Sequence, residues 1–116
     1  MRGLDWRSVS EEEQWLWWEC AWRDTCELQE RYELPVRRGW WEHPIQLEAL
    51  AALAAWVSGY DTGEWDDPNG KLSLLLDLER VAMLLRDGNE PFYPERDRPA
   101  FDLYLQAIDC LPPEDE

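Results

Sequence analysis

Carboxylates beside aromatic rings give one short segment of the chain its clearest chemistry. The segment 59–70, GYDTGEWDDPNG, has no basic residue. Its carboxylates are those of Asp61, Glu64, Asp66 and Asp67. Placed next to Tyr60 and Trp65, they suit a guanidinium or ammonium group, through ion pairing and stacking on a ring. We therefore expect this acidic loop to bind a cationic group. The alternative is a solvated turn in which Asp67 caps the helix that begins at Pro68.

Metal chemistry fits the same loop poorly. An EF-hand counted from Asp61 fails, because Gly63, Trp65 and Leu72 fall where oxygen ligands are needed. Two carboxylate pairs, Glu27-x-x-Glu30 and Glu64-x-x-Asp67, resemble those that hold Mg²⁺ in all-α nucleoside triphosphate pyrophosphatases. No cluster of lysine or arginine accompanies the second pair to bind phosphate. A Mg²⁺-dependent nucleotide hydrolase is therefore only the third hypothesis, and we expect no cofactor and no metal.

The remaining nucleophiles and ligands do not form a catalytic set. His43 is the only histidine, and no glycine-rich phosphate loop or nucleophile elbow is present. The three cysteines, Cys20, Cys26 and Cys110, have neither metal-site nor disulfide-framework spacing. The sequence also contains no secretory-type start and no apolar run long enough to span a membrane. We expect a reduced, cytoplasmic protein that is not an enzyme.

Net charge points to the kind of partner. The 116 residues include 26 acidic and 11 basic side chains, which gives a formal charge of −15. Such a surface repels nucleic acid and anionic membranes and attracts cationic partners. The acidity could instead serve solubility alone, because net charge reports on association and not on fold.

Nine tryptophans set the second question, which is whether they form core or surface. On a helix, Trp15, Trp18 and Trp22 share one face, so we expect them to pack in the core. Four others diverge from that face or lie in connectors, and among these we expect at least one exposed binding anchor. They are Trp17, Trp40, Trp41 and Trp65.

Periodicity predicts an all-α, single-domain, irregular four-helix bundle over residues 1–116. The expected helices span about 11–32, 44–58, 68–87 and 99–111, followed by a flexible acidic tail at 112–116. The first is rich in tryptophan and begins with a capping box formed by Ser10 and Glu13. The second is apolar nearly all round, which places it in the middle of the bundle, and Gly59 is expected to end it.

A second apolar stripe on the third expected helix supports an alternative. Leu72, Leu76 and Met83 recur at helical spacing beside the main stripe of that helix. If they are exposed, the protein could be a helical adaptor, a chaperone-like subunit or a homodimer.

The favoured hypothesis is a non-enzymatic acidic domain that occupies a basic surface of a protein partner, as inhibitors, immunity proteins and DNA mimics do. Exposed tryptophans would anchor the complex. The residues expected to bind are Asp61, Glu64, Trp65, Asp66, Asp67, Trp17 and Trp40.

Overall fold

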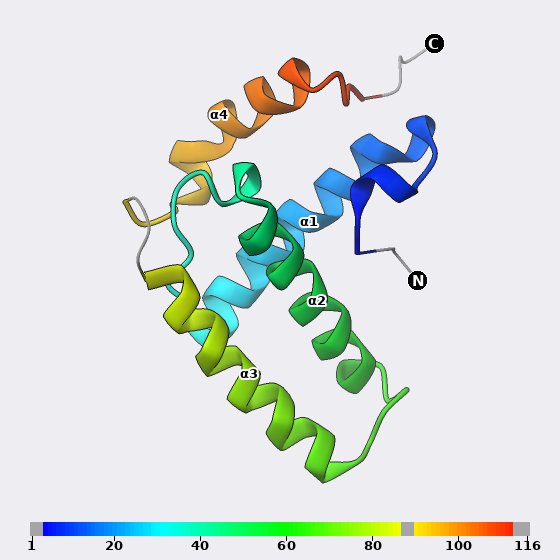
Figure 1. Ribbon diagram of the computed structural model, residues 1–116, viewed down its shortest axis with the longest axis vertical. Coiled ribbons are helices and arrows are strands. Elements are labelled where there is room, and N and C mark those ends of the chain that lie inside the picture. The colour runs from blue at the N-terminus through cyan, green and yellow to red at the C-terminus, as the bar shows by residue number, and fades with distance from the viewer. Residues whose placement is uncertain (1–3, 87–89, 113–116) are drawn as a thin grey trace.

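The computed structural model describes residues 4–86 and 90–112, which form an all-α fold (Figure 1). Its four α-helices are α1 (Glu11–Tyr32), α2 (Pro44–Asp61), α3 (Pro68–Arg86) and α4 (Pro94–Ala107). Two 3-10 turns, η1 (Trp6–Ser8) and η2 (Trp40–Glu42), precede α1 and α2. The predicted all-α four-helix architecture is confirmed.

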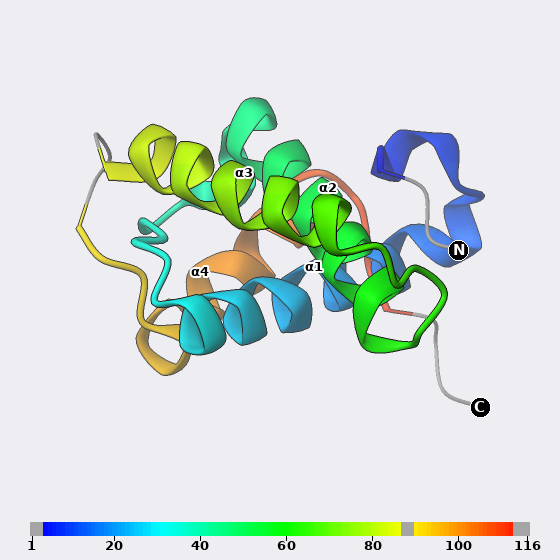
Figure 2. The same cartoon turned by 90° about the horizontal axis from the view of Figure 1, so that it is seen from below.

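Helix α2 lies at the centre of the arrangement. It packs against α1 on one side and against α3 on the other, as Figures 1 and 2 show. Leu50, Leu53 and Val57 are buried in these contacts. An apolar helix needs neighbours on more than one side, and the central position of α2 confirms the prediction from its composition.

Aromatic rings form most of the core between α1, α4 and the connectors. Trp22 of α1 lies 4.7 Å from Phe101 of α4 and 5.0 Å from Phe92 of the connector before it, measured between ring centroids. Trp18 is fully buried and Trp22 is 9% exposed, while Trp15 is half-buried against the same cluster. The stripe on the first helix is therefore core, because its large rings pack against those of α4 and the connectors.

Two connectors run antiparallel and close one end of the molecule. The amide of Phe92 donates to the carbonyl of Val36 at 2.9 Å, and the amide of Arg38 donates to the carbonyl of Glu90 at 2.7 Å. Arg37 of the first connector then reaches the C-terminal end of α3. Its guanidinium donates to the carbonyls of Leu85 and Arg86, both at 3.2 Å. These carbonyls belong to the last turn of the helix, so Arg37 acts as its cap.

Helix α4 corrects the prediction of 99–111, because it begins at Pro94 and not at Pro99. The cause is Asp97, a fully buried carboxylate that accepts the amide of Tyr93 at 3.0 Å and so closes the first turn. The helix ends early because Asp109 adopts a left-handed φ of 63°. The amide of Cys110 then donates to the carbonyl of Leu105 at 2.9 Å, as in a Schellman motif.

The other boundaries follow the prediction more closely. Helix α1 spans the predicted residues, although the side chain of Ser10 makes no capping hydrogen bond. Helix α2 continues through Gly59 to Asp61, so the predicted end at 58 is wrong. The predicted end of the third helix at 87 and residues 113–116 of the tail lie outside the described residues. Within the described ranges, no helix is both long enough and apolar enough to cross a membrane.

Candidate functional site

Trp65 covers the end of α2 and explains why Gly59 is there. A Cβ atom on Gly59 would lie 2.1 Å from a carbon of the Trp65 ring, so only glycine lets the ring approach the helix. The amide of Trp65 donates to the carbonyl of Gly59 at 3.0 Å, which fixes the loop against the last turn. The Trp65 side chain remains 37% exposed. Of the four tryptophans among which an exposed anchor was expected, Trp65 is thus exposed, and its role in binding stays a prediction.

Asp67 has a structural role at the start of α3. Its carboxylate accepts the amide of Gly70 at 2.7 Å and the hydroxyl of Tyr60 at 3.0 Å. The first bond caps α3, which confirms the structural reading of this residue. The face of Tyr60 already receives a cation from the chain itself, because the Lys71 ammonium lies 5.5 Å from the ring centroid. Partial desolvation and the hydrogen bond to Asp67 raise the pKa of Tyr60.

Asp61 ties the end of α2 to the end of α1. Its carboxylate accepts a hydrogen bond from Arg31 at 2.7 Å. That bond lowers the pKa of Asp61 and raises the pKa of Arg31. Both side chains remain partly exposed, so the pair orients the two helices more than it stabilises them.

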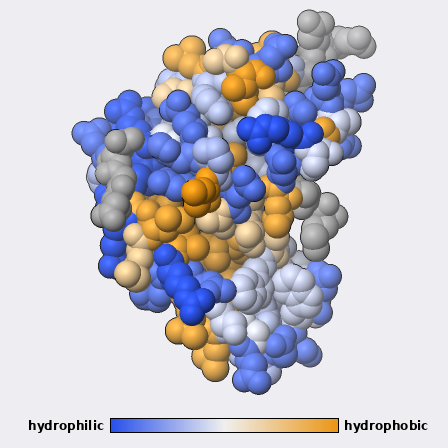
Figure 3. All heavy atoms as spheres, in the orientation of Figure 1, coloured by the Kyte–Doolittle hydropathy of each residue, from blue (hydrophilic) through white to orange (hydrophobic). Residues whose placement is uncertain are grey.

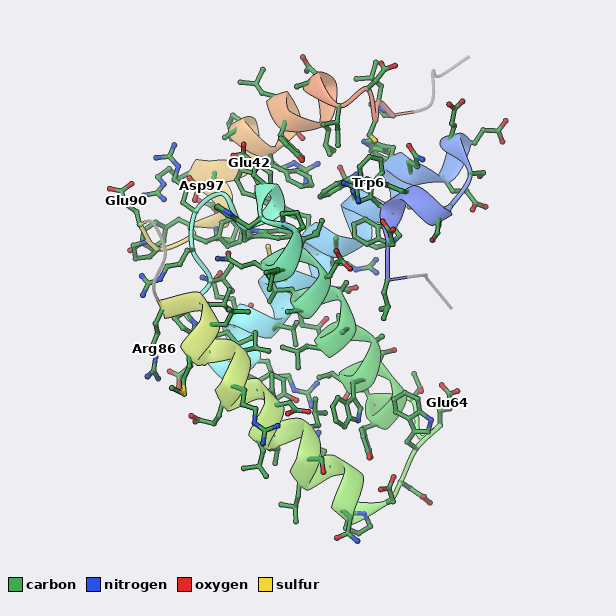
Figure 4. The ribbon with its side chains drawn as sticks, viewed as in Figure 1. Trp6, Glu42, Glu64, Arg86, Glu90 and Asp97 are labelled. Carbon is green, nitrogen blue, oxygen red and sulfur yellow. The ribbon has the colours of Figure 1, made fainter. Side chains whose placement is uncertain are left out.

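A groove of about 560 Å³ separates the second half of α1 from the last turns of α2. Its walls carry acidic side chains from both helices and from the loop after α2, together with two arginines. The acids are Asp24, Glu27, Asp61 and Glu64, and the arginines are Arg23 and Arg31. Figure 4 shows Glu64 projecting from the loop that follows α2.

The negative electrostatic potential of the groove has two sources. Arg31 pairs with Asp61, and Arg23 lies 3.7 Å from Asp24, so each arginine is matched to a carboxylate. Neither of these pairs involves Glu27 or Glu64. The C-terminal end of α2 also lies here, where the helix dipole places about half a negative charge, although the loop amides of Thr62, Gly63 and Trp65 already bond to carbonyls of its last turn. A guanidinium or ammonium group brought by another molecule would therefore be favoured in the groove.

Two predicted anchors are not on the surface. Trp17 is 2% exposed and packs edge-to-face on Trp18, with ring centroids 5.3 Å apart. Trp40 is fully buried and lies 6.3 Å from Phe101, and Trp41 is 2% exposed. The expectation that Trp17 or Trp40 is exposed is wrong: the ring of Trp17 packs on Trp18, and the connector that carries Trp40 folds back over the core. We assign neither a role in binding.

The remaining acidic positions divide between groove and surface. Asp66 is exposed but does not line the groove. Glu27 and Asp24 do line it. The sequence connects Glu27 with Glu64 only through the resemblance to Mg²⁺ sites and does not single out Asp24. That they meet in one groove depends on how α1 crosses α2, which no local pattern reports.

The hypothesis of a metal-dependent hydrolase gains no support from geometry. Over residues 4–86 and 90–112, no three side chains of His, Cys, Asp or Glu converge as metal ligands would. His43 is exposed and precedes Pro44 at the start of α2. The three cysteines are free.

The second apolar stripe of α3 lies on the surface. We call Leu72, Leu76 and Met83 the α3 stripe; their exposed fractions are 60%, 62% and 64%. Leu75 and Leu84, at 40% and 44%, widen it on either side. The condition set for an adaptor or homodimer, that neither α4 nor the connectors cover this stripe, is met within the described residues.

Comparisons with known proteins give no family for this chain. A scan against protein-family models finds no match, and neither the curated proteins nor the solved structures include a significantly similar one.

Proposed function

We propose that this protein is a non-enzymatic acidic domain that binds a basic surface of another protein. The groove between α1 and α2 would receive an arginine or lysine side chain of that partner. The observation that carries the proposal is the meeting of Glu27, Glu64 and the C-terminal end of α2 around one concave surface. Charge of this kind acts mainly on the rate of association and on specificity.

Trp65 supports the proposal as the neighbouring contact surface. Its ring lies on Gly59, which lines the groove, and more than a third of the side chain is exposed. A rigid, half-exposed indole beside carboxylates suits a guanidinium that forms an ion pair and stacks. Asp61 and Asp66 would contribute to the surrounding negative potential. Asp67 would contribute only indirectly, by holding the start of α3.

The biological setting follows from the same features. A formal charge of −15 disfavours direct binding to nucleic acid or to an anionic membrane. The free cysteines fit the reducing cytoplasm. Blocking a cationic site on a nuclease, a toxin or a nucleic-acid-binding protein is the activity that such a domain would perform without a cofactor.

Capture of the partner from lysate tests the proposal, with two charge-matched variants as baits. The variant Glu27→Lys/Glu64→Lys reverses two charges in the groove. The variant Glu11→Lys/Glu12→Lys makes the same change in net charge on exposed residues of the first turn of α1. We expect a basic protein that elutes at moderate salt, that the first-turn variant still captures, and that the groove variant loses. Equal capture by both variants would show that only overall charge matters and would contradict the groove.

A further inference from the structure

The α3 stripe raises a question that the acidic groove does not answer. It presents three large apolar side chains, each about 60% exposed or more, on one face of a helix. Figure 3 shows apolar side chains gathered over α3 and beside α2. Several large apolar side chains exposed on one face of a helix mark a candidate interaction site.

The charge of α3 favours a second copy of this chain as the molecule that covers the stripe. Residues 68–86 carry three basic side chains, Lys71, Arg80 and Arg86, against two acidic ones, Asp77 and Glu79. Each of the other three α-helices has more acidic than basic residues. Two copies of a strongly acidic protein would repel least where these helices face each other.

The two ends of α3 also carry opposite charge. The loop before its first turn contributes Glu64, Asp66 and Asp67, while Arg86 and the capping Arg37 lie at its last turn. Figure 4 shows Arg86 at the last turn of α3 and Glu64 in the loop that leads from α2 to α3. An antiparallel pair of α3 helices therefore places the acidic end of each copy beside the basic end of the other. A parallel pair would place like charges together at both ends.

We propose that the protein forms a symmetric homodimer in which the α3 stripes of two copies pack together with the helices antiparallel. A two-fold axis near the middle of α3 gives such an isologous contact, because the same residues serve both sides. Glu79 and Arg80 are exposed and lie on the same face of α3, between Leu76 and Met83, so one charge of each sign enters the contact from each copy. None of the residues of the α3 stripe lines the groove between α1 and α2, and the acidic end of α3 shares only Glu64 with it.

Salt distinguishes the dimer from the binding proposed for the groove. Each copy carries −15, so raising the salt concentration screens repulsion between copies and should strengthen self-association. Binding of a basic partner depends on attraction and should weaken over the same range. Failure of one proposal is thus visible without failure of the other.

Analytical ultracentrifugation over a concentration series in roughly 0.3 M salt tests the dimer. We expect a species of twice 13.8 kDa. Leu76→Glu and, independently, Met83→Glu should raise the dissociation constant by at least about tenfold, because each would bury a charge in the interface. The matched control is Leu103→Glu on α4, where the leucine is 64% exposed and lies outside the stripe. Circular dichroism establishes that each variant keeps its helices.

A charge exchange between the ends of α3 tests the orientation. Asp66→Arg alone and Arg86→Glu alone should each weaken the antiparallel dimer, because each places like charges together. The double variant should restore the wild-type dissociation constant. A wild-type chain that remains monomeric, a control that weakens the dimer as much as Leu76→Glu, or a double variant weaker than either single one would overturn the proposal.

Discussion

Gly59 illustrates how one missing Cβ atom shapes the candidate site. Sequence alone makes a glycine near the end of an apolar stretch look like a helix terminator, but Gly59 is helical and its helix continues to Asp61. The residue is needed for close approach, since the Trp65 ring occupies the space of a side chain. The acidic loop is held against the groove by this contact.

The contact between Gly59 and Trp65 predicts that the effect of Gly59→Ala on the free energy of unfolding depends on whether Trp65 is present. Gly59→Ala should lower the free energy of unfolding by about 1–3 kcal/mol, because the new methyl group collides with Trp65. In a Trp65→Ala background the same change should be neutral or stabilising by up to about 1 kcal/mol, since alanine is the better helix former. Chemical denaturation of the four proteins measures both effects. A Gly59→Ala variant as stable as wild type would show that the ring does not rest there.

Asp97 is the buried charge that organises the opposite end of the molecule. It accepts hydrogen bonds from Arg96 at 2.8 Å and from the amide of Tyr93, and Arg38 lies 3.2 Å away. Burial alone would raise the pKa of Asp97. The hydrogen bonds from Arg96 and Tyr93, together with the charges of Arg96 and Arg38, outweigh that effect and lower the pKa below its ordinary value of 3.8.

A lowered pKa in the folded protein makes the contribution of Asp97 depend on pH. The stabilisation is complete above the unfolded value and is lost as pH falls through the folded one. Asp97→Asn should therefore lower the free energy of unfolding at neutral pH by about 1–3 kcal/mol. This difference from wild type should shrink below about pH 4. Asp102→Asn, at an exposed pair with Arg98, is the control and should cost less than about 1 kcal/mol. A difference that stays constant down to pH 2 would contradict the lowered pKa.

At the scale of elements, local signals predicted three helices well and one poorly. Ser10 followed by glutamates, Pro44 and Pro68 each mark a helix start that the structure confirms. Pro99 misled, because Asp97 closes the preceding turn by accepting the amide of Tyr93 and pairs with Arg96 beside it and with Arg38 of another connector. Trp17 and Trp40 failed because whether a ring is buried depends on what packs over it.

Arg37 makes a contact between distant elements, because it lies in the connector before α2 and caps the end of α3. Arg37→Ala should lower the free energy of unfolding by about 1–2 kcal/mol, since two carbonyls of the last turn of α3 lose a charged donor. Arg7→Ala provides the control, because Arg7 is exposed and its ion-pair distance to Asp5 is 3.7 Å. Thermal or chemical denaturation at low protein concentration keeps self-association out of the comparison. Equal losses for the two variants would show that Arg37 is not a cap.

At the scale of the whole molecule, self-repulsion should limit stability. A formal charge of −15 on 116 residues opposes the compact state more than the extended one. Raising sodium chloride from roughly 0.02 to 0.5 M should therefore raise the free energy of unfolding, as screening shortens the range of repulsion. A decrease would mean that ion pairs such as Arg31–Asp61 outweigh the net repulsion.

The most direct test of the groove is a titration of the ¹⁵N-labelled protein with a short arginine-rich peptide, followed by amide chemical shifts. We predict that the shifts concentrate on α1 around Glu27 and on the loop around Glu64, and that Glu27→Lys/Glu64→Lys abolishes them. Shifts spread equally over the first turn of α1 and the rest of the acidic surface, and retained in that variant, would contradict a defined cation-binding groove.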